Sequence, residues 1–306
     1  MRNLFRKLIS VLLIVACVFI NTSAFAESNL TIHFLDVGQG AAAIIQCDGE
    51  VMMFDGGSAG NSSFIYSYLQ NTLGIEHIDV MVASHPHEDH IGGLSGALNA
   101  CSVGTIYSPV TEYDSKTFSS LLKYAGKQGL SLTVPSVGDT FTVGSATATF
   151  LSPAKAYDNI NDLSLVVRVV YGDTSFLFTG DAEWDAEHDM VEAGMELSST
   201  LLSVGHHGSN TSSSYVFLRE VMPEYAVISV GKDNSYGHPS EDTLSRLRDV
   251  GALVYRTDLQ GTITCVSDGH TVTFETEKNG IADALDKSMV IASSGPMSTF
   301  DRGETE

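Results

Sequence analysis

Residues 84–93 read SHPHEDHIGG and hold three histidines, a glutamate and an aspartate within six consecutive positions, in a chain with ten histidines in all. The preceding run, residues 78–84, is apolar and has the length of a buried strand. The cluster therefore follows the C-terminal end of a strand, where imidazole and carboxylate groups can converge from a rigid support on a divalent ion such as zinc. Gly92 and Gly93 allow close backbone packing where the chain enters the next helix. The stretch predicts metal binding.

The order of residues inside the cluster is compatible with two metal ions. His85 and His87 can direct both rings into one cavity, and Asp89 and His90 can reach a second point a few ångströms away. A single histidine at a strand end is commonly a hydrogen-bonded loop residue, but this set of potential ligands favours a metal site. Glu88 is interpreted as a solvent-facing spacer between them.

Short β-like runs alternate with helical patterns along the rest of the chain, without internal repeats, up to about residue 276. This alternation predicts one compact α/β domain over residues 27–276. The predicted strands lie at 31–35, 42–46, 51–54, 78–84, 201–204 and 225–230, the predicted hairpins at 133–151, 163–179 and 253–276, and the predicted helices at 62–73, 115–127, 183–194, 212–222 and 240–249.

Histidines recur at two later strand ends. His206 and His207 follow the predicted strand 201–204, and His238 lies in the loop after the predicted strand 225–230. Histidines that follow the end of a predicted strand therefore occur at two further places along the chain.

The first 26 residues have the features of a signal peptide. Three cations precede an apolar run of about 13 residues, and Ala24-Phe25-Ala26 has the small-x-small pattern of a cleavage site. That run is short for the roughly 20 residues that a membrane span needs. We expect a secreted or cell-surface protein that meets the membrane only through this segment. A lipoprotein box at residues 14–17 is an alternative, although the residues after Cys17 stay apolar.

The composition argues against a broad surface for long nucleic acids. The formal charge of the chain is −21, and removal of three cations with residues 1–26 makes it −24. Such a field repels a polyphosphate at long range, although bound metal ions could offset it locally. Residues 277–306 are polar, end in acidic residues and are interpreted as a tail.

Three cysteines remain after cleavage at Ala26, and none forms a CxxC pair. One disulfide plus a free thiol is possible in an exported protein, but each cysteine lies in or beside an apolar segment. We therefore expect three buried thiols at Cys47, Cys101 and Cys265.

The pattern His85-x-His87-x-Asp89-His90-x-Gly92-Gly93 resembles the signature of metallo-β-lactamase-fold hydrolases. The resemblance extends over roughly residues 31–275 to one subgroup, the hydrolase domain of ComEC-type competence (DNA-uptake) proteins and its stand-alone relatives. The further motifs, in the order of that subgroup, are DVGQG at 36–40, FDGG at 54–57, NDLSLV at 161–166, TGD at 179–181, HHGS at 206–209 and GHP at 237–239.

The resemblance implies a four-layer αβ/βα sandwich, in which helices flank two mixed β-sheets and the metal cleft lies at one sheet edge. It also implies two zinc ions, with manganese as an alternative. The implied roles are His85 and His87 on one metal, Asp89 and His90 on the other, Asp181 as a bridge, one of His206 and His207 completing the second site, His238 as a ligand or substrate contact, and Asp55 orienting the metal loop through hydrogen bonds.

The sequence departs from the wider superfamily at one place. Many members have a further histidine before the bridging aspartate, but the matching stretch here, residues 159–162, reads NIND. Asn161 or Asp162 could substitute weakly. The sequence therefore predicts one tightly bound metal and one labile metal.

The hypothesis for function is an exported metal-dependent hydrolase, a phosphodiesterase or nuclease. A bound metal lowers the pKa of water from about 15.7 to about 7 and so generates hydroxide at neutral pH, and two metals can clamp a phosphoryl group. Asp89 could orient the nucleophile, and His206 or His238 could stabilise charge or protonate the leaving group. The substrate would be a small-molecule or polymer phosphodiester, DNA included.

Two alternatives stay open. An exported enzyme would meet cell-envelope phosphodiesters, such as phosphorylcholine on teichoic acid. The fold could also be retained as a non-catalytic metal-binding module. The missing histidine disfavours β-lactam hydrolysis, and the sequence does not predict an oligomeric state.

Overall fold

The computed structural model describes residues 29–280. The predicted signal peptide, residues 1–26, and residues 281–306 of the predicted tail lie outside the described residues. Within the described range, no helix combines the length and the apolar character that a bilayer crossing requires.

The described residues form two mixed sheets. The first has the strand order β15-β14-β1-β2-β3-β4-β5-β6 and the second has the order β13-β12-β11-β10-β9-β8-β7. The strands of the first sheet are β1 (Leu30–Phe34), β2 (Ala43–Cys47), β3 (Glu50–Phe54), β4 (His77–Val82), β5 (Ser102–Tyr107), β6 (Leu132–Thr133), β14 (Ile263–Ser267) and β15 (Val272–Thr276). Those of the second are β7 (Thr140–Val143), β8 (Ala146–Ser152), β9 (Val166–Tyr171), β10 (Thr174–Phe178), β11 (Leu201–Ser203), β12 (Tyr225–Ile228) and β13 (Leu253–Arg256).

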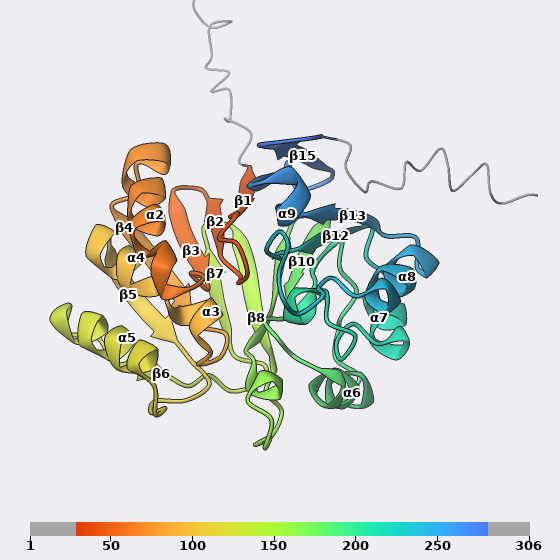
Figure 1. Cartoon of the computed structure of the whole chain (residues 1–306), viewed down its shortest axis with the longest axis horizontal. Coiled ribbons are helices and arrows are strands. Elements are labelled where there is room, and N and C mark those ends of the chain that lie inside the picture. Colours follow the sequence, from red (N-terminus) through yellow and green to blue (C-terminus); the bar gives the residue numbers. More distant parts are fainter. Residues whose placement is uncertain (1–28, 281–306) are drawn as a thin grey trace, which may run out of the picture.

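Helices cover the outer face of each sheet (Figure 1). The first sheet packs against α2 (Ser62–Ser67), which continues as a π-helix over Tyr68–Leu73, and against α3 (Glu88–Ile91), α4 (Leu94–Ala100) and α5 (Lys116–Lys127). The second packs against α6 (Trp184–Glu192), α7 (Tyr215–Val221) and α8 (Glu241–Asp249), and the short α9 (Thr257–Gln260) follows β13. The predicted four-layer αβ/βα sandwich is confirmed.

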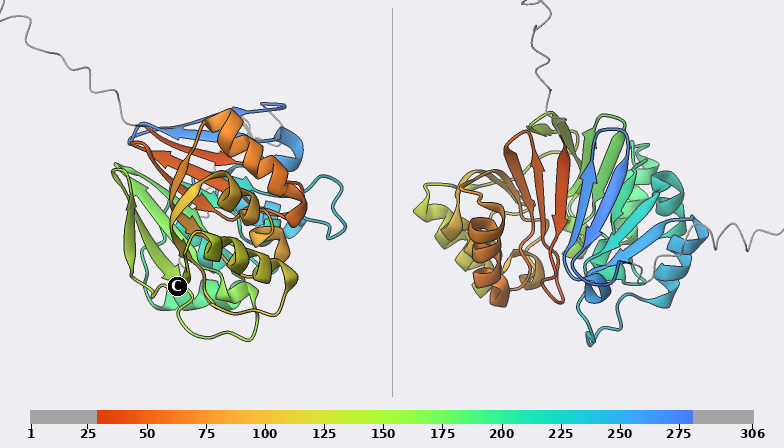
Figure 2. Two further views of the ribbon diagram at one scale, coloured as in Figure 1. Left: turned by 90° about the vertical axis from the view of Figure 1, so that its left-hand side faces the viewer. Right: turned by 90° about the horizontal axis from the view of Figure 1, so that it is seen from above.

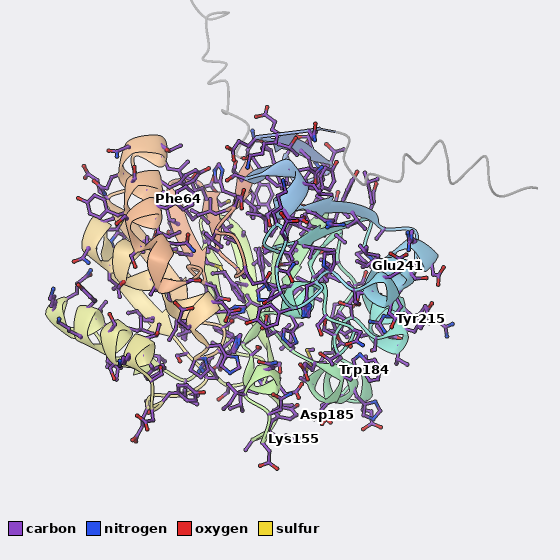
Figure 3. All side chains as sticks on the ribbon, viewed as in Figure 1. Phe64, Lys155, Trp184, Asp185, Tyr215 and Glu241 are labelled. Atoms are coloured by element: carbon purple, nitrogen blue, oxygen red, sulfur yellow. The ribbon has the colours of Figure 1, made fainter. Side chains whose placement is uncertain are left out.

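Three apolar layers hold the sandwich together: one between the sheets and one between each sheet and its helices. Aromatic rings join the two sheets at the centre, where the Phe178 ring lies 5.2 Å from Phe54 and 6.1 Å from Phe34, centroid to centroid. Figure 2 shows the two sheets face to face. The exposed aromatic side chains Phe64, Trp184 and Tyr215 lie on the outer helical layers, away from this core (Figure 3).

The predicted early strands and the predicted hairpin 163–179 are confirmed. The predicted buried thiols are also found: the three cysteines of the described residues are free and buried. The predicted hairpin 253–276 is wrong. Its first strand, β13, pairs with β12 in the second sheet, whereas β14 and β15 form a hairpin in the first sheet. Similarly, only β7 and β8 of the segment 133–151 form a hairpin, and β6 pairs with β5.

Candidate metal centre

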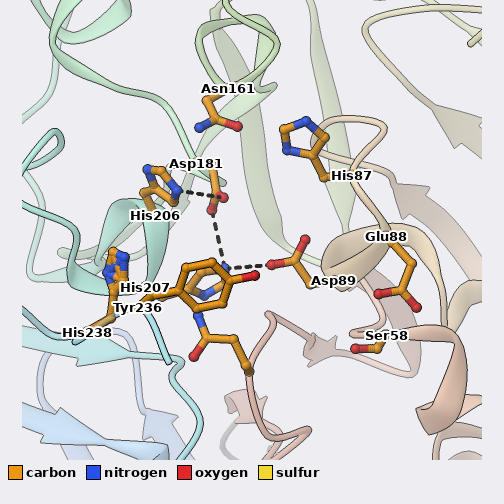
Figure 4. A pocket seen from close by; sticks show the side chains of 11 residues that line it. Ser58, His87, Glu88, Asp89, Asn161, Asp181, His206, His207, Tyr236 and His238 are labelled. Atoms are coloured by element: carbon orange, nitrogen blue, oxygen red, sulfur yellow. Dashed lines mark hydrogen bonds and ion pairs between the residues drawn. The ribbon is translucent and has the colours of Figure 1, made fainter. Parts of the chain in front are cut away.

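The polar side chains of the centre follow the C-terminal ends of β4, β10, β11 and β12. Strands β10, β11 and β12 are parallel, so their C-terminal ends lie at the same edge of the second sheet. The histidine run after β4 comes from the first sheet and meets them there. Figure 4 shows His87 and Asp89 facing His206 and His207 across a pocket.

This pocket is a cleft of about 510 Å³. Among the described residues that line it there is no lysine or arginine, so this lining offers no permanent cation to an anionic substrate. The lining residues are Gln39, Ser58, His87, Glu88, Asp89, Asn161, Asp181, His206, His207, Tyr236 and His238. His85 and His90 are fully buried beneath them.

Asp55 organises the floor of the cleft. It is fully buried, has a left-handed backbone (φ 59°), and accepts from the Ser84 N–H through Oδ1 at 2.8 Å. Its Oδ2 accepts from Ser84 Oγ at 2.6 Å and from His90 Nδ1 at 2.7 Å. Since the Ser84 hydroxyl gives its hydrogen to Asp55, its oxygen accepts from His85 Nδ1 at 3.1 Å. The hydrogen-bonding role expected for Asp55 is thus found.

The histidine pair is held in the same manner. His207 Nδ1 donates to the Ser229 carbonyl at 2.9 Å, and His206 Nδ1 donates to Glu183 Oε1 at 2.8 Å. His85, His90, His206 and His207 thus each carry a hydrogen on Nδ1, so Nε2 is the nitrogen that can bind a metal once it is deprotonated. An oxygen acceptor that fixes one ring nitrogen is the usual support of a histidine that binds metal through the other nitrogen.

The Nε2 atoms of these four histidines converge on the Asp181 carboxylate, whose side chain is 4% exposed. His90 Nε2 lies 3.0 Å and His207 Nε2 lies 3.8 Å from Oδ1. The Nε2 atoms of His85 and His206 each lie 3.8 Å from Oδ2. Two sets, His85-His90-Asp181 and Asp89-His90-His207, bring their ligand atoms within 4.8 Å of one another.

Two atoms at the centre make no hydrogen bond. His90 Nε2 and Asp181 Oδ1 are buried and lie 3.0 Å apart, but their arrangement does not have hydrogen-bond geometry. Buried polar groups of native proteins are almost always satisfied. A divalent ion would satisfy both atoms, so these residues fit the metal that a cluster of this composition predicts.

The electrostatics of the cluster favour a cation. Burial disfavours the charged form of His90, but the carboxylates of Asp181 and Asp55 outweigh it and raise the pKa of His90 well above its usual value. Burial likewise opposes the ionised form of Asp181, but His90 and His207 lower its pKa well below the usual range. Because metal ligands bind in the deprotonated form, a divalent ion would displace the proton held there.

All seven predicted metal ligands lie in this cluster, although their binding of metal stays a prediction. His87 Nδ1 is 3.1 Å from His85 Nε2, close to the spacing of about 3.3 Å that two nitrogens on one tetrahedral zinc would have. Asp89 Oδ2 is 3.2 Å from His207 Nε2. His238 lies beside the cluster, with its ring centroid 5.7 Å from that of His206, and its buried Nδ1 has no hydrogen-bond partner.

The stretch that lacks the expected histidine contributes in another way. Asp162 Oδ1 accepts from the backbone N–H groups of Glu183 and Ala186 at the start of α6 and does not line the cleft. Asn161 does line the cleft and donates from Nδ2 to Glu183 Oε1 at 3.1 Å. Asp162 is therefore a helix cap, and the suggestion that it substitutes as a ligand is wrong.

Sequence reasoning missed Glu183 and Tyr236. Glu183 precedes α6, where an acidic residue is ordinary, so only its contact with His206 reveals a role. Tyr236 lies in the loop after β12 and is 72% exposed. Glu88 is exposed, as expected of a spacer, but its Oε1 also accepts from the Ala59 N–H at 2.7 Å.

Residues 35–232 match the family model described as the metallo-beta-lactamase superfamily. Competence protein ComA of Neisseria gonorrhoeae is 34% identical over 257 residues, which cover 83% of this chain and 35% of that protein. ComE operon protein 3 of Bacillus subtilis (strain 168) is 28% identical over 255 residues, 78% of this chain and 33% of that protein. The chain thus spans about a third of the length of these relatives.

A solved structure supports the fold alone. Igni18, a metallo hydrolase from the hyperthermophilic archaeon Ignicoccus hospitalis KIN4/I, is 14% identical, with a TM-score of 0.50 over 77% of this chain and 98% of that chain.

Proposed function

The chain belongs to the metallo-beta-lactamase superfamily and is related to competence proteins, and from that premise we propose that it is an exported metal-dependent phosphodiesterase of the nuclease type. The observation that carries the proposal is the convergence of histidine Nε2 atoms on both oxygens of Asp181, within a cleft that holds no lysine or arginine among the described residues.

Divalent ions held by this cluster would supply Lewis acidity and a nucleophile at neutral pH. Because the described lining residues include no lysine or arginine, the metal ions would be the cations that attract a phosphodiester. This favours a substrate whose phosphate binds at the Asp181 cluster. Asp89, half-buried beside His207, would orient the nucleophile. His238 can donate a hydrogen bond to the leaving oxygen, because its ring lies beside the cluster and its Nδ1 has no hydrogen-bond partner within the protein.

Tyr236 supports a substrate that carries a base. The loop between β12 and α8 projects from the sandwich (Figure 2), and Tyr236 lines the cleft from this loop. Asn234 Oδ1 fixes the turn by accepting from the N–H groups of Tyr236 and His238, both at 3.1 Å. An aromatic face beside a phosphate site can stack a base, which stabilises binding by about 1–3 kcal/mol per base.

The acidic charge of the chain favours short or single-stranded substrates over long duplexes. A cell-envelope phosphodiester with a cationic headgroup is the second candidate, because the same tyrosine face and the acidic surroundings suit a quaternary ammonium group. Hydrolysis rates of the two substrate classes separate the candidates.

The test compares thymidine 5′-(p-nitrophenyl phosphate), single-stranded DNA and p-nitrophenyl phosphorylcholine after the chain has been stripped of metal and reloaded with manganese or zinc. We expect hydrolysis of the first two, loss of hydrolysis in His90→Ala, and full activity in His270→Ala, whose side chain is exposed and pairs with Asp173. Absence of hydrolysis in every metal, despite bound metal, would sink the proposal. Export is tested separately by sequencing the N-terminus of the extracellular protein, which should begin at Glu27.

A further inference from the structure

We infer that His206 supplies the third nitrogen of the first metal site, beside His85 and His87, while His207 serves the second site with Asp89 and His90. The inference rests on the proposed metal-dependent function only in requiring that the cluster bind metal ions. It replaces the expectation of one tight and one labile ion with two sites that have the same number of protein ligands.

The Asp181 carboxylate divides the cluster into two halves. Oδ1 faces the Nε2 atoms of His90 and His207, at 3.0 and 3.8 Å. Oδ2 faces the Nε2 atoms of His85 and His206, both at 3.8 Å. Each oxygen therefore faces its own pair of histidines, although the ligand atoms of His85, His90 and Asp181 also lie within 4.8 Å of one another.

The remaining ligands fall on the same two sides. His87 Nδ1 lies 3.1 Å from His85 Nε2, which puts it with the Oδ2 group. Asp89 Oδ2 lies 3.2 Å from His207 Nε2, which puts it with the Oδ1 group. The first site then has the ligands His85, His87, His206 and Asp181, and the second has Asp89, His90, His207 and Asp181.

The backbone of the pair explains how adjacent residues reach opposite sides. His206 and His207 both have left-handed dihedral angles, with φ 49° and 54°. Consecutive left-handed residues other than glycine are unfavourable and persist only where the surroundings enforce them, commonly at functional sites. The result is a wide separation of the rings, with centroids 6.2 Å apart and planes at 65°.

Glu183 holds His206 in this position. Its Oε1 accepts from His206 Nδ1 at 2.8 Å and from Thr211 Oγ1 at 2.9 Å. Asn161 Nδ2 donates to the same oxygen at 3.1 Å, and Asn159 Nδ2 donates to Oε2 at 2.8 Å. The stretch that lacks the superfamily histidine thus anchors the carboxylate that orients a different histidine, and Glu183 is a positioning residue.

The test is titration of the metal-free chain with Mn²⁺, followed by calorimetry and electron paramagnetic resonance. We expect two ions and a spin-coupled pair in the unchanged protein. His206→Ala should retain one ion and lose the coupling, and Glu183→Gln should weaken one ion by about 10- to 100-fold while the other is unaffected. His270→Ala, with an exposed imidazole remote from the cluster, is the matched control and should behave like the unchanged protein.

Two coupled ions of unchanged affinity in His206→Ala would overturn the inference, as would a single ion in the unchanged protein. Circular dichroism of the metal-free variants establishes that each is folded. If His206→Ala does not fold, Glu183→Gln still tests the inference, because glutamine has nearly the same shape as glutamate. The readout is independent of turnover. Two coupled ions without phosphodiester hydrolysis would refute the proposed function and leave this inference standing. Hydrolysis with only one bound ion would refute this inference and leave the proposed function standing.

Discussion

Replacement of Asp55 by asparagine should leave the neutral imidazole of His90, the form that binds metal, with its hydrogen on Nε2 instead of Nδ1. The carboxylate now accepts from the backbone N–H of Ser84 through Oδ1 and from Ser84 Oγ and His90 Nδ1 through Oδ2. An asparagine must place its NH₂ group on one of these sides. The Ser84 N–H cannot turn away, whereas the hydroxyl and the imidazole can adapt, so we expect the NH₂ group at the Oδ2 position.

His90 Nδ1 must then accept a hydrogen bond, and the hydrogen moves to Nε2, 3.0 Å from Asp181 Oδ1. A protonated Nε2 cannot bind metal. We expect Mn²⁺ affinity at the second site to fall by about 10- to 100-fold, the usual effect of removing a hydrogen-bond partner from a ligating histidine. The free energy of unfolding of the metal-free chain should fall by about 1–3 kcal/mol, because a hydrogen bond to a buried charged group is lost.

Calorimetric titration with Mn²⁺ measures the first effect, and urea unfolding in EDTA measures the second. Asp79→Asn is the matched control, because Asp79 also accepts a backbone N–H, that of Val51 at 2.8 Å, but lies on β4 outside the cluster. It should lose stability without losing metal affinity. Unchanged metal affinity in Asp55→Asn would refute the reasoning about the imidazole hydrogen.

Three further changes probe the fold and the cleft. Burial, opposed by the backbone N–H groups of Ser214 and Ser213, raises the pKa of Glu187 from 4.5 to about 7, so its contribution to stability is present below pH 4.5 and is lost as pH rises through about 7. As pH rises from 5 to 8, the free energy of unfolding of Glu187→Gln should therefore improve by up to about 3 kcal/mol relative to that of the unchanged protein. A pH-independent loss is added to this, because the glutamine NH₂ group must face the backbone N–H of Ser213 or Ser214. A difference in unfolding free energy that does not change with pH, measured by urea unfolding, would contradict this. A Cβ on Gly93 would lie 1.9 Å from the Gly56 carbonyl oxygen, so Gly93→Ala should destabilise the chain by about 1–3 kcal/mol or more in thermal unfolding. Gly126 lies on α5, where a Cβ would meet no other atom within 4 Å, so Gly126→Ala should stabilise the chain by about 0.5–1 kcal/mol. Equal changes in stability for the two variants would contradict the close contact between Gly93 and Gly56. Tyr236→Ala should lower kcat/KM for thymidine 5′-(p-nitrophenyl phosphate) by about 10-fold, whereas Tyr236→Phe should change it little. For methyl p-nitrophenyl phosphate, which carries no base, Tyr236→Ala should also change kcat/KM little. An equal loss of kcat/KM for both substrates in Tyr236→Ala would exclude base stacking.

Much of the centre could be predicted because its residues lie close together in sequence or at strand ends. The run from His85 to His90 follows a strand that apolar residues make recognisable, and Asp181 follows a hairpin with a clear turn at Gly172-Asp173. The parallel arrangement of β10, β11 and β12 then brings the later ligands to the same edge. At these positions the strands that the sequence predicts and the sheet that they form bring the same residues to one edge.

Other features depend on contacts that no local pattern records. The segment 253–276 contains strands of the right length, but their division between two sheets depends on pairing of β13 with β12 and of β14 with β1. The separate directions of His206 and His207 depend on left-handed backbone angles that residue type does not predict. Glu183 resembles an ordinary acidic residue before a helix until its contact with His206 is seen.

The most direct test of metal-dependent phosphodiester hydrolysis is the rate of cleavage of thymidine 5′-(p-nitrophenyl phosphate) as metal-free protein is titrated with Mn²⁺. The arrangement around Asp181 predicts that the rate rises with added metal and reaches its plateau at two equivalents, and that His90→Ala stays inactive throughout. A protein that binds two equivalents of Mn²⁺ and hydrolyses nothing, or one that is equally active without metal, would contradict it.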